Sequence, residues 1–350
     1  MSSTLRKKED SSIDIVKFIS SFLIVSIHSS PFEDYSATFN YYFENVFARI
    51  AVCLFFVITG YYFFKGIDFE NGKIKKSKEN KQRLFKYVSR ILILYVVWSL
   101  IYLVWMIPEW YNTGWLSLMA FIDFGISFLL NSGYYHLWFL LGLIYAIPIM
   151  YFLLRFIRLK YFVVLSFLIY IFGMLSNTYS FIGLPTNKYI QMLYESVPIL
   201  NTVIFVVIPL LCISIIAQKI NLPSRVYGVL SVLFLILYSC EAMYLYGITK
   251  GECSYTYIIV FTIPATLFTF LFLKSLKCNI NNGYFLRKTS SLIYCVHPLI
   301  INIIHLCFGE NTLNSTLEYL IVAILSMLLS AMIFCLYKKF KFCKFLKYFM

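Results

Sequence analysis

The sequence predicts an all-α polytopic membrane protein with about ten transmembrane helices and both termini in the cytoplasm. Hydrophobic residues make up 61% of the 350 residues, only 13% are charged, and the mean hydropathy is +0.79. A soluble domain of this length would carry about twice that density of charge. Apolar runs of about 17 to 25 residues recur along the whole chain, and each is long enough to cross a bilayer.

Ten spans are expected, in chain order, at 13–30, 46–65, 91–107, 134–154, 161–177, 199–217, 226–246, 256–273, 290–308 and 316–337. The segment 114–131 is also apolar, but it carries Asp123 and adjoins the fourth span. We therefore interpret it as an interfacial or re-entrant piece and not as a further span. Together the spans form a single predicted membrane domain over residues 1–350.

The basic residues predict the orientation of these spans. With both termini inside, every Lys and Arg falls on the cytoplasmic side except Lys17, Arg49, Lys188 and Lys250. The expected cytoplasmic parts include the N-terminal segment 1–12, the basic loop 66–90 and the basic tail 338–350. The net charge of +14 is thereby explained by a plasma-membrane topology, and no nucleic-acid partner is expected.

The lysine-rich stretch from Lys73 to Lys86 is the one low-complexity segment, and we expect it to be solvated and to lie against anionic lipid headgroups. The first apolar run follows Arg6-Lys7-Lys8, as a secretory signal would. Because Asp14 and Lys17 interrupt its early part, we expect it to remain as the first span.

Ionisable residues lie inside that first span, where they are costly unless they have a function. Lys17 and His28 are eleven residues apart, so they share one helix face at a separation of roughly 16 Å along the axis. Asp14 and Ser21 lie on the same face. Lys17 is near the start of the span and His28 near its end, so the face could link events at the two membrane surfaces.

The other histidines are His136, at the start of the fourth span, His297, directly before Pro298, and His305. A proline inside a helix frees a backbone carbonyl, which polar groups or a substrate can use. A histidine in an aromatic-rich span is more often a packing residue than a catalyst. The chain has no HExxH, no carboxylate-rich cluster and no paired Cys and His ligands, so no metal site is expected.

At these residues the chain resembles the acyltransferase 3 family of integral-membrane acyltransferases. The family includes O-acetyltransferases of bacterial surface polysaccharides and the membrane halves of vancomycin-resistance serine racemases. The resemblance rests on Lys17 and His28 within SIDIVKFISSFLIVSIHSSPF, on FARIAVCLFFVITGYYF with Arg49, on HLWFL from His136, and on SLIYCVHP ending at His297 and Pro298. Many members carry arginine where this chain has Lys17. The stretch from Ser12 to Phe63 is most similar to the racemase membrane halves.

The resemblance implies transfer of an acyl group from cytosolic acetyl-CoA, a co-substrate and not a bound cofactor, to an acceptor at the outer side. The implied acceptor is a cell-envelope glycan or a lipid-linked precursor. His28 is the expected general base, because histidine titrates near neutrality, and Asp14 and Lys17 are its companions on the same face. Arg83 and Lys86 take the place of the basic pair that follows the family's second helix, with Arg90 nearby.

These three cations are expected to bind the phosphates of the donor, although an ordinary positive-inside anchor explains them equally well. The expected acceptor-binding residues are Arg49, His136, Trp138 and His297. Arg49 could instead pair with Glu44. A second class of function stays open, a transport or delivery module for a small polar molecule such as serine, and a third is a structural or sensor protein.

Overall fold

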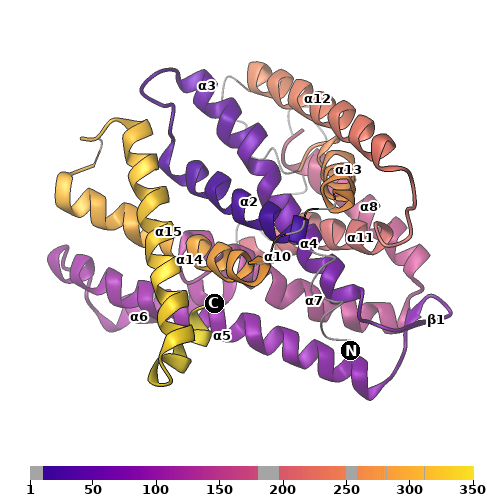
Figure 1. Ribbon diagram of the computed structural model, residues 1–350, viewed down its shortest axis with the longest axis horizontal. Helices are drawn as coiled ribbons and strands as arrows, with labels where there is room; N and C mark the ends of the chain where they lie inside the picture. The colour runs from indigo at the N-terminus through magenta and orange to yellow at the C-terminus, as the bar shows by residue number, and fades with distance from the viewer. Residues whose placement is uncertain are drawn as a thin grey trace. The chain divides into compact units, whose positions relative to one another are not determined.

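The computed structural model describes residues 11–179, 197–249, 258–276, 278, 280, 282–310 and 312–350. Its elements, in chain order, are α2 (Ser11–Ser29), α3 (Ala37–Tyr42), the π-helix η1 (Phe43–Ala48), α4 (Arg49–Phe64), β1 (Phe69–Glu70), β2 (Lys73–Ile74), α5 (Lys78–Asn112), α6 (Leu118–Leu130), η2 (Tyr135–Leu137), α7 (Trp138–Phe156), α8 (Leu159–Ser176), α10 (Pro198–Thr202), the π-helix η4 (Val203–Val207), α11 (Ile208–Ile216), α12 (Ser224–Ile248), α13 (Thr262–Ser275), α14 (Gly283–Phe308), α15 (Ser315–Lys339) and η5 (Phe342–Phe349). Figure 1 shows these helices, and the all-α prediction is confirmed.

Nine stretches of the described chain are long and apolar enough to cross a membrane, and they match nine of the ten expected spans. The remaining expected span, 256–273, overlaps α13, which has 14 residues. At 1.5 Å per residue α13 is about 21 Å long, shorter than the roughly 30 Å hydrocarbon core of a bilayer. Residues 250–257 before it lie outside the described ranges. The orientation of the spans stays a prediction.

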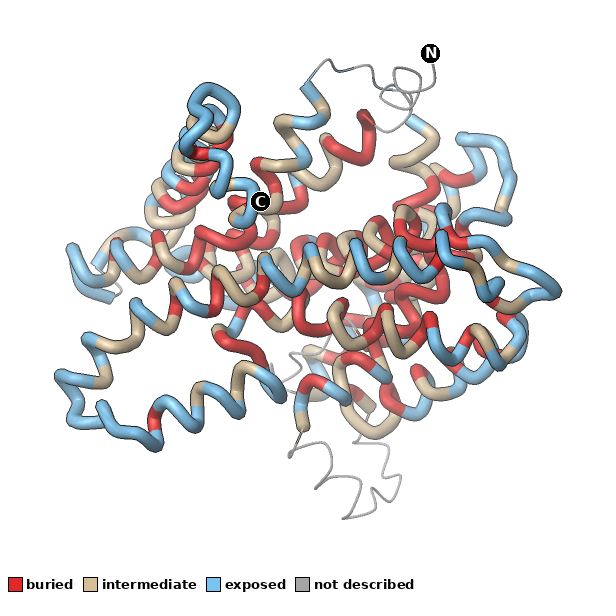
Figure 2. Tube along the Cα trace, turned by 90° about the horizontal axis from the view of Figure 1, so that it is seen from below, coloured by how far each residue is buried: buried red, intermediate tan, exposed pale blue. Residues whose placement is uncertain are grey.

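The described chain forms two compact units by its internal packing. The first comprises Met1–Thr59, Ile213–Tyr348 and Met350; the second comprises Gly60–Cys212 and Phe349. In both units most helices expose large apolar side chains along one side, as Val229 and Ile236 do on α12 and Leu100 and Val104 do on α5. Figure 2 shows buried and exposed stretches alternating along the helices. Apolar faces of this kind suit contact with lipid.

In the first unit α2 packs against α14, α15, α13 and η1 (Figure 1). Its buried face is rich in serine, including Ser20, Ser21 and Ser26. Small side chains let membrane helices approach closely. Ser21 and Ser26 donate their hydroxyl protons to backbone carbonyls of α2 itself, so they add no unsatisfied polar group to the interface.

In the second unit α5 packs against α7, and α6 contacts α5 and α10. Helix α6 covers most of the segment expected to be interfacial or re-entrant. It has 13 residues and exposes Leu118, Met119, Ile122 and Ile126. Its length of about 20 Å is too short to cross a bilayer by itself. The interfacial interpretation stays a prediction.

Candidate active site

Two imidazole rings lie against each other in the first unit. His28, in the last turn of α2, is stacked with His297 of α14, with ring centroids 5.3 Å apart and an interplanar angle of 29°. His297 is fully buried and His28 is half-buried. The two residues are 269 positions apart in the sequence, and the packing of α2 on α14 brings them together. Two of the three histidines expected in the site therefore lie together.

The proton arrangement of His297 follows from its contact with its own helix. Its Nδ1 lies 3.1 Å from the carbonyl oxygen of Ile293. A carbonyl can only accept, so Nδ1 carries the proton in the neutral ring and Nε2 carries the lone pair. Pro298 has no N–H for the carbonyl of Tyr294 one turn earlier, and that backbone group also interacts with His297. The carbonyl freed by the proline thus helps to orient the histidine.

Arg49 lies near this histidine pair. It is the first residue of α4, and its charge acts on His28. Its Nη2 donates to Oδ1 of Asn45 at 2.6 Å, and the backbone carbonyl of Asn45 accepts a hydrogen bond from the Tyr238 hydroxyl at 3.3 Å. The alternative partner, Glu44, interacts electrostatically with Arg49 and accepts a hydrogen bond from Asn40 at 2.8 Å. Arg49 is thus held by a neutral amide, and its charge acts on His28.

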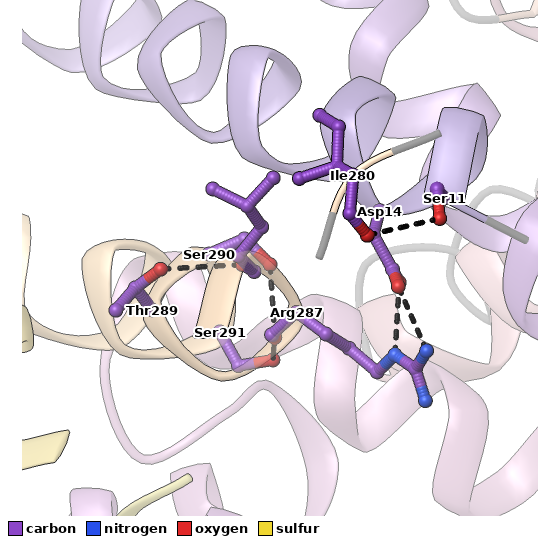
Figure 3. Close-up of polar contacts among 8 residues, drawn as sticks. Ser11, Asp14, Ile280, Arg287, Thr289, Ser290 and Ser291 are labelled. Atoms are coloured by element: carbon purple, nitrogen blue, oxygen red, sulfur yellow. Dashed lines mark hydrogen bonds and ion pairs between the residues drawn. The ribbon is translucent and has the colours of Figure 1, made fainter. Parts of the chain in front are cut away.

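Asp14 takes part in an ion pair that the sequence did not predict. Arg287 of α14 donates from Nε to Oδ1 and from Nη2 to Oδ2 of Asp14, each at 2.8 Å (Figure 3). Asp14 is buried, whereas the Arg287 side chain is half exposed. A Cβ at Gly283 would lie 2.8 Å from Asp14 Oδ2, so a larger residue there would displace the carboxylate.

The carboxylate of Asp14 therefore fixes α2 against α14. Ser11 adds a longer contact beside it, from its hydroxyl to the carbonyl of Ile280 at 3.5 Å (Figure 3). Lys17 follows Asp14 by one turn on α2 and is half-buried. The expected roles of Asp14 and Lys17 as companions of the base stay predictions.

His136 and Trp138 belong to the second unit, and aromatic rings surround the histidine there. The His136 ring centroid lies 5.0 Å from that of Tyr102, 5.8 Å from Tyr134 and 5.6 Å from Tyr135, each with an edge-on geometry. Tyr102 and Tyr134 are themselves stacked, 4.1 Å apart. His136 is 2% exposed, and Trp138 is the first residue of α7. The arrangement resembles a packed aromatic cluster.

The three cations expected to bind the donor have different surroundings. Arg83 is half-buried and donates from Nε to the carbonyl of Phe63 at 2.9 Å and from Nη2 to the carbonyl of Tyr62. Its guanidinium thus caps the C-terminal end of α4. Lys86 and Arg90 are exposed on α5. Any contact between Arg83 and a donor would use its remaining N–H groups.

No group of three or more His, Cys, Asp or Glu side chains in the described part of the chain is arranged to hold a metal ion. Sequence reasoning missed three residues of the site, Arg287, Asn45 and Tyr238. A signal existed for the first of these, because a buried carboxylate such as Asp14 requires a partner. Nothing in the sequence identified which of the many basic residues it was.

Comparison with known proteins agrees with the motifs. The profile of a family described as an acyltransferase domain matches residues 10–335. The chain belongs to this family, acyltransferase 3. Similar proteins include an amino-acid racemase of Enterococcus faecalis, 25% identical over 97% of this chain, and a serine/alanine racemase of Enterococcus gallinarum, 26% identical over 90%.

The chain spans about half the length of these curated relatives, since the matches cover 48% and 44% of them. No solved structure matches. The expected resemblance to the family and to racemases is confirmed.

Proposed function

We propose that this member of the acyltransferase family moves an acetyl group from cytosolic acetyl-CoA to a hydroxyl of a cell-envelope glycan or lipid-linked precursor at the outer side of the plasma membrane. The family match supports acyl transfer in general. The stacked His28 and His297 carry the proposal, because they supply an acid-base group beside a cation in a multi-pass membrane protein.

In the proposed reaction His28 takes up one proton and later returns it. Its imidazole accepts the proton of the acceptor hydroxyl, the oxygen attacks the thioester carbonyl carbon, and the carbon–sulfur bond breaks. The imidazolium then returns the proton to the departing thiolate of CoA, so that atoms and charge balance. Arg49 stabilises the oxyanion that forms on the carbonyl oxygen, a task suited to a fixed cation in a dry site. His297 holds the His28 ring in place by stacking.

The donor enters from the cytosol in this proposal. Lys17 lies about three turns from His28 on α2 and binds the pantetheine arm or the phosphate end of the donor. Arg83, Lys86 and Arg90 bind donor phosphates, and His136 and Trp138 bind the acceptor. This arrangement requires cytoplasmic termini. Reporter fusions after Lys78 and Arg158 should then report cytoplasm, and a fusion after Tyr35 should report the exterior.

The test is release of CoA thiol from acetyl-CoA by the purified protein in proteoliposomes that carry an envelope glycan fraction. Radiolabelled acetyl should appear on the acceptor in the wild type and not in His28→Ala. Absence of thiol release with several acceptor fractions would contradict the proposal.

A second function is favoured by the names of the relatives, both of which are racemases of amino acids. Under that alternative the membrane domain delivers a small polar molecule such as serine. Uptake of labelled serine into proteoliposomes without any acetyl transfer would select it.

A further inference from the structure

A pocket of about 360 Å³ lies at the surface of the second unit, and none of the residues of the candidate active site lines it. It is formed by the β1–β2 hairpin and by the corner between α7 and α8. Five cations and one carboxylate line it, namely Lys73, Lys75, Lys76, Arg155, Arg158 and Glu70. The volume falls at the small end of the range for ligand pockets, about 300 to 1,000 Å³.

The hairpin that carries three of these cations has a defined geometry. Phe69 pairs with Ile74 and Glu70 with Lys73, so the loop between the strands has only two residues. Those residues, Asn71 and Gly72, have φ angles of 50° and 76°. Positive φ at both positions is the type I′ turn, for which Asn-Gly is the preferred sequence.

The hairpin is also fixed to its surroundings at both ends. At its tip the backbone N–H of Leu159 donates to the carbonyl of Gly72 at 2.6 Å. At its base the buried Asn80 side chain donates to the carbonyls of Asp68 and Lys75, both at 3.0 Å, and accepts from the N–H of Asp68. Ile74 is 3% exposed. The lysines of the hairpin therefore start from a rigid backbone, which is what a preorganised binding site needs.

The charges in the pocket are not balanced by the protein. None of the five cations forms an ion pair within the described ranges, although Glu70 lines the same pocket. The positive-inside rule explains basic residues on one side of a membrane. It does not explain why two segments about 80 positions apart converge on one concavity, or why a turn and a buried amide hold one of them there. Like charges this close repel one another, and a bound polyanion removes that cost.

We propose that this pocket, lined by the hairpin and the α7–α8 corner, binds an anion that carries two or more phosphate groups. Lysine and arginine are the residues that proteins use for phosphate, by charge-assisted hydrogen bonds. The same chemistry is offered by two sources, the diphosphate part of a soluble nucleotide and the headgroup of an anionic lipid that carries two phosphates. The proposal does not depend on acyl transfer, because binding is measured without any reaction.

The experiment measures calorimetric binding of inorganic pyrophosphate to the full chain in nanodiscs of neutral phosphatidylcholine. Lys73→Gln combined with Arg158→Gln removes one cation from each side of the pocket and should weaken binding by about tenfold or more. Lys78→Gln combined with Lys81→Gln is the matched control. It removes the same charge from the exposed start of α5, outside the pocket, and should change the dissociation constant less than about twofold.

A second variant tests whether binding requires the geometry of the hairpin or only its positive charge. Gly72→Val keeps all five cations but places a β-branched residue at φ +76°, so the turn must change. Binding should fall by several fold at full protein yield, whereas Asn71→Gly should retain it. Equal binding by Gly72→Val and the wild type, equal losses in the pocket variant and its control, or no pyrophosphate binding at all would each overturn the proposal.

Competition experiments then show whether the natural ligand is a soluble nucleotide or a lipid headgroup. Adenosine 5′-diphosphate displaces pyrophosphate if the natural ligand is a soluble nucleotide. Replacement of one quarter of the lipid by cardiolipin, whose headgroup carries two phosphates, weakens pyrophosphate binding, and does so only when the pocket is intact, if the ligand is a headgroup. Either pattern supports the shared chemistry.

Discussion

The chain holds two buried histidines in contrasting surroundings. His297, in the first unit, stacks on the imidazole of His28, and Arg49 acts on the same ring. His136, in the second unit, is enclosed by the rings of Tyr102, Tyr134 and Tyr135. Both belong to motifs that resemble the same family. Burial and membership of a family motif therefore do not show whether a histidine takes part in proton transfer. The ionisable groups beside the histidine are the better guide.

The largest effect is expected from removing the imidazole of His28. His28→Ala should lower acetyl transfer by roughly 10²-fold or more, the usual cost of losing a general base, at unchanged expression. The measurement is radiolabel transfer by the purified protein. His305→Gln is the control, because His305 Nε2 contacts Glu318 Oε1 at 3.0 Å and glutamine can keep a hydrogen bond there. Equal losses in the two variants would mean that these histidines matter for packing only.

A smaller effect is expected from Lys17, which tests whether the first site extends along α2. Lys17→Met should raise the KM for acetyl-CoA by about tenfold or more, since it removes a charge-assisted contact to the donor. Lys17→Arg preserves the charge and should retain most activity. Steady-state kinetics at varied acetyl-CoA concentration would measure this change. An unchanged KM in Lys17→Met would contradict a role of Lys17 in binding the donor.

A substitution at His136, in the second unit, should change a different kinetic constant from a substitution at His28. His136→Phe keeps an aromatic ring among the tyrosines, so the fold should persist, while the acceptor KM should rise by up to about tenfold at nearly constant kcat. The matched change in the first unit, His297→Phe, should lower kcat. If both phenylalanine variants lowered kcat alike, the distinction between the two histidines would be wrong.

The smallest effect concerns stability and not activity. Asp14→Asn and Arg287→Gln should each destabilise the protein in thermal unfolding, and the double variant should lose less than the sum, with a coupling of about 1 to 3 kcal/mol. The half-exposed guanidinium places the value in the lower part of that range. In the parallel cycle of Asp14→Asn with Lys17→Met, a comparable coupling would show that Lys17 shares the carboxylate, and the donor path along α2 would have to be abandoned.

Local signals in the sequence predicted the helices well. Nine spans matched because an apolar run of sufficient length needs no knowledge of its neighbours. The pairing of His28 with His297 was not predicted, since it depends on how α2 packs against α14. The partner of Asp14 could not be found, because Arg287 lies 273 positions away and many other cations were available.

Two local features were not predicted because they depend on context. The β1–β2 hairpin was not predicted within the basic loop, although Asn71-Gly72 is a strong hairpin signal when a short strand lies on each side. The contact of Arg83 Nε and Nη2 with two carbonyls at the end of α4 was also not predicted, and its expected role in donor binding stays a prediction. Orphan carbonyls occur at every helix end, so the sequence alone does not indicate which arginine will cap them.

The π-helical turn η1 has a consequence for the helical phase of the chain. Phe43–Ala48 is continuous with α3 before it and with α4 after it, and both flanking residues have helical backbone angles. A π turn holds one residue more than an α turn, so it acts as an insertion within a helix. Deletion of one residue there should close the π turn to an α turn and leave the residues on either side in nearly the same orientation, because either turn completes one revolution. Sequence alignments that cross this segment should therefore permit a one-residue gap inside an unbroken helix.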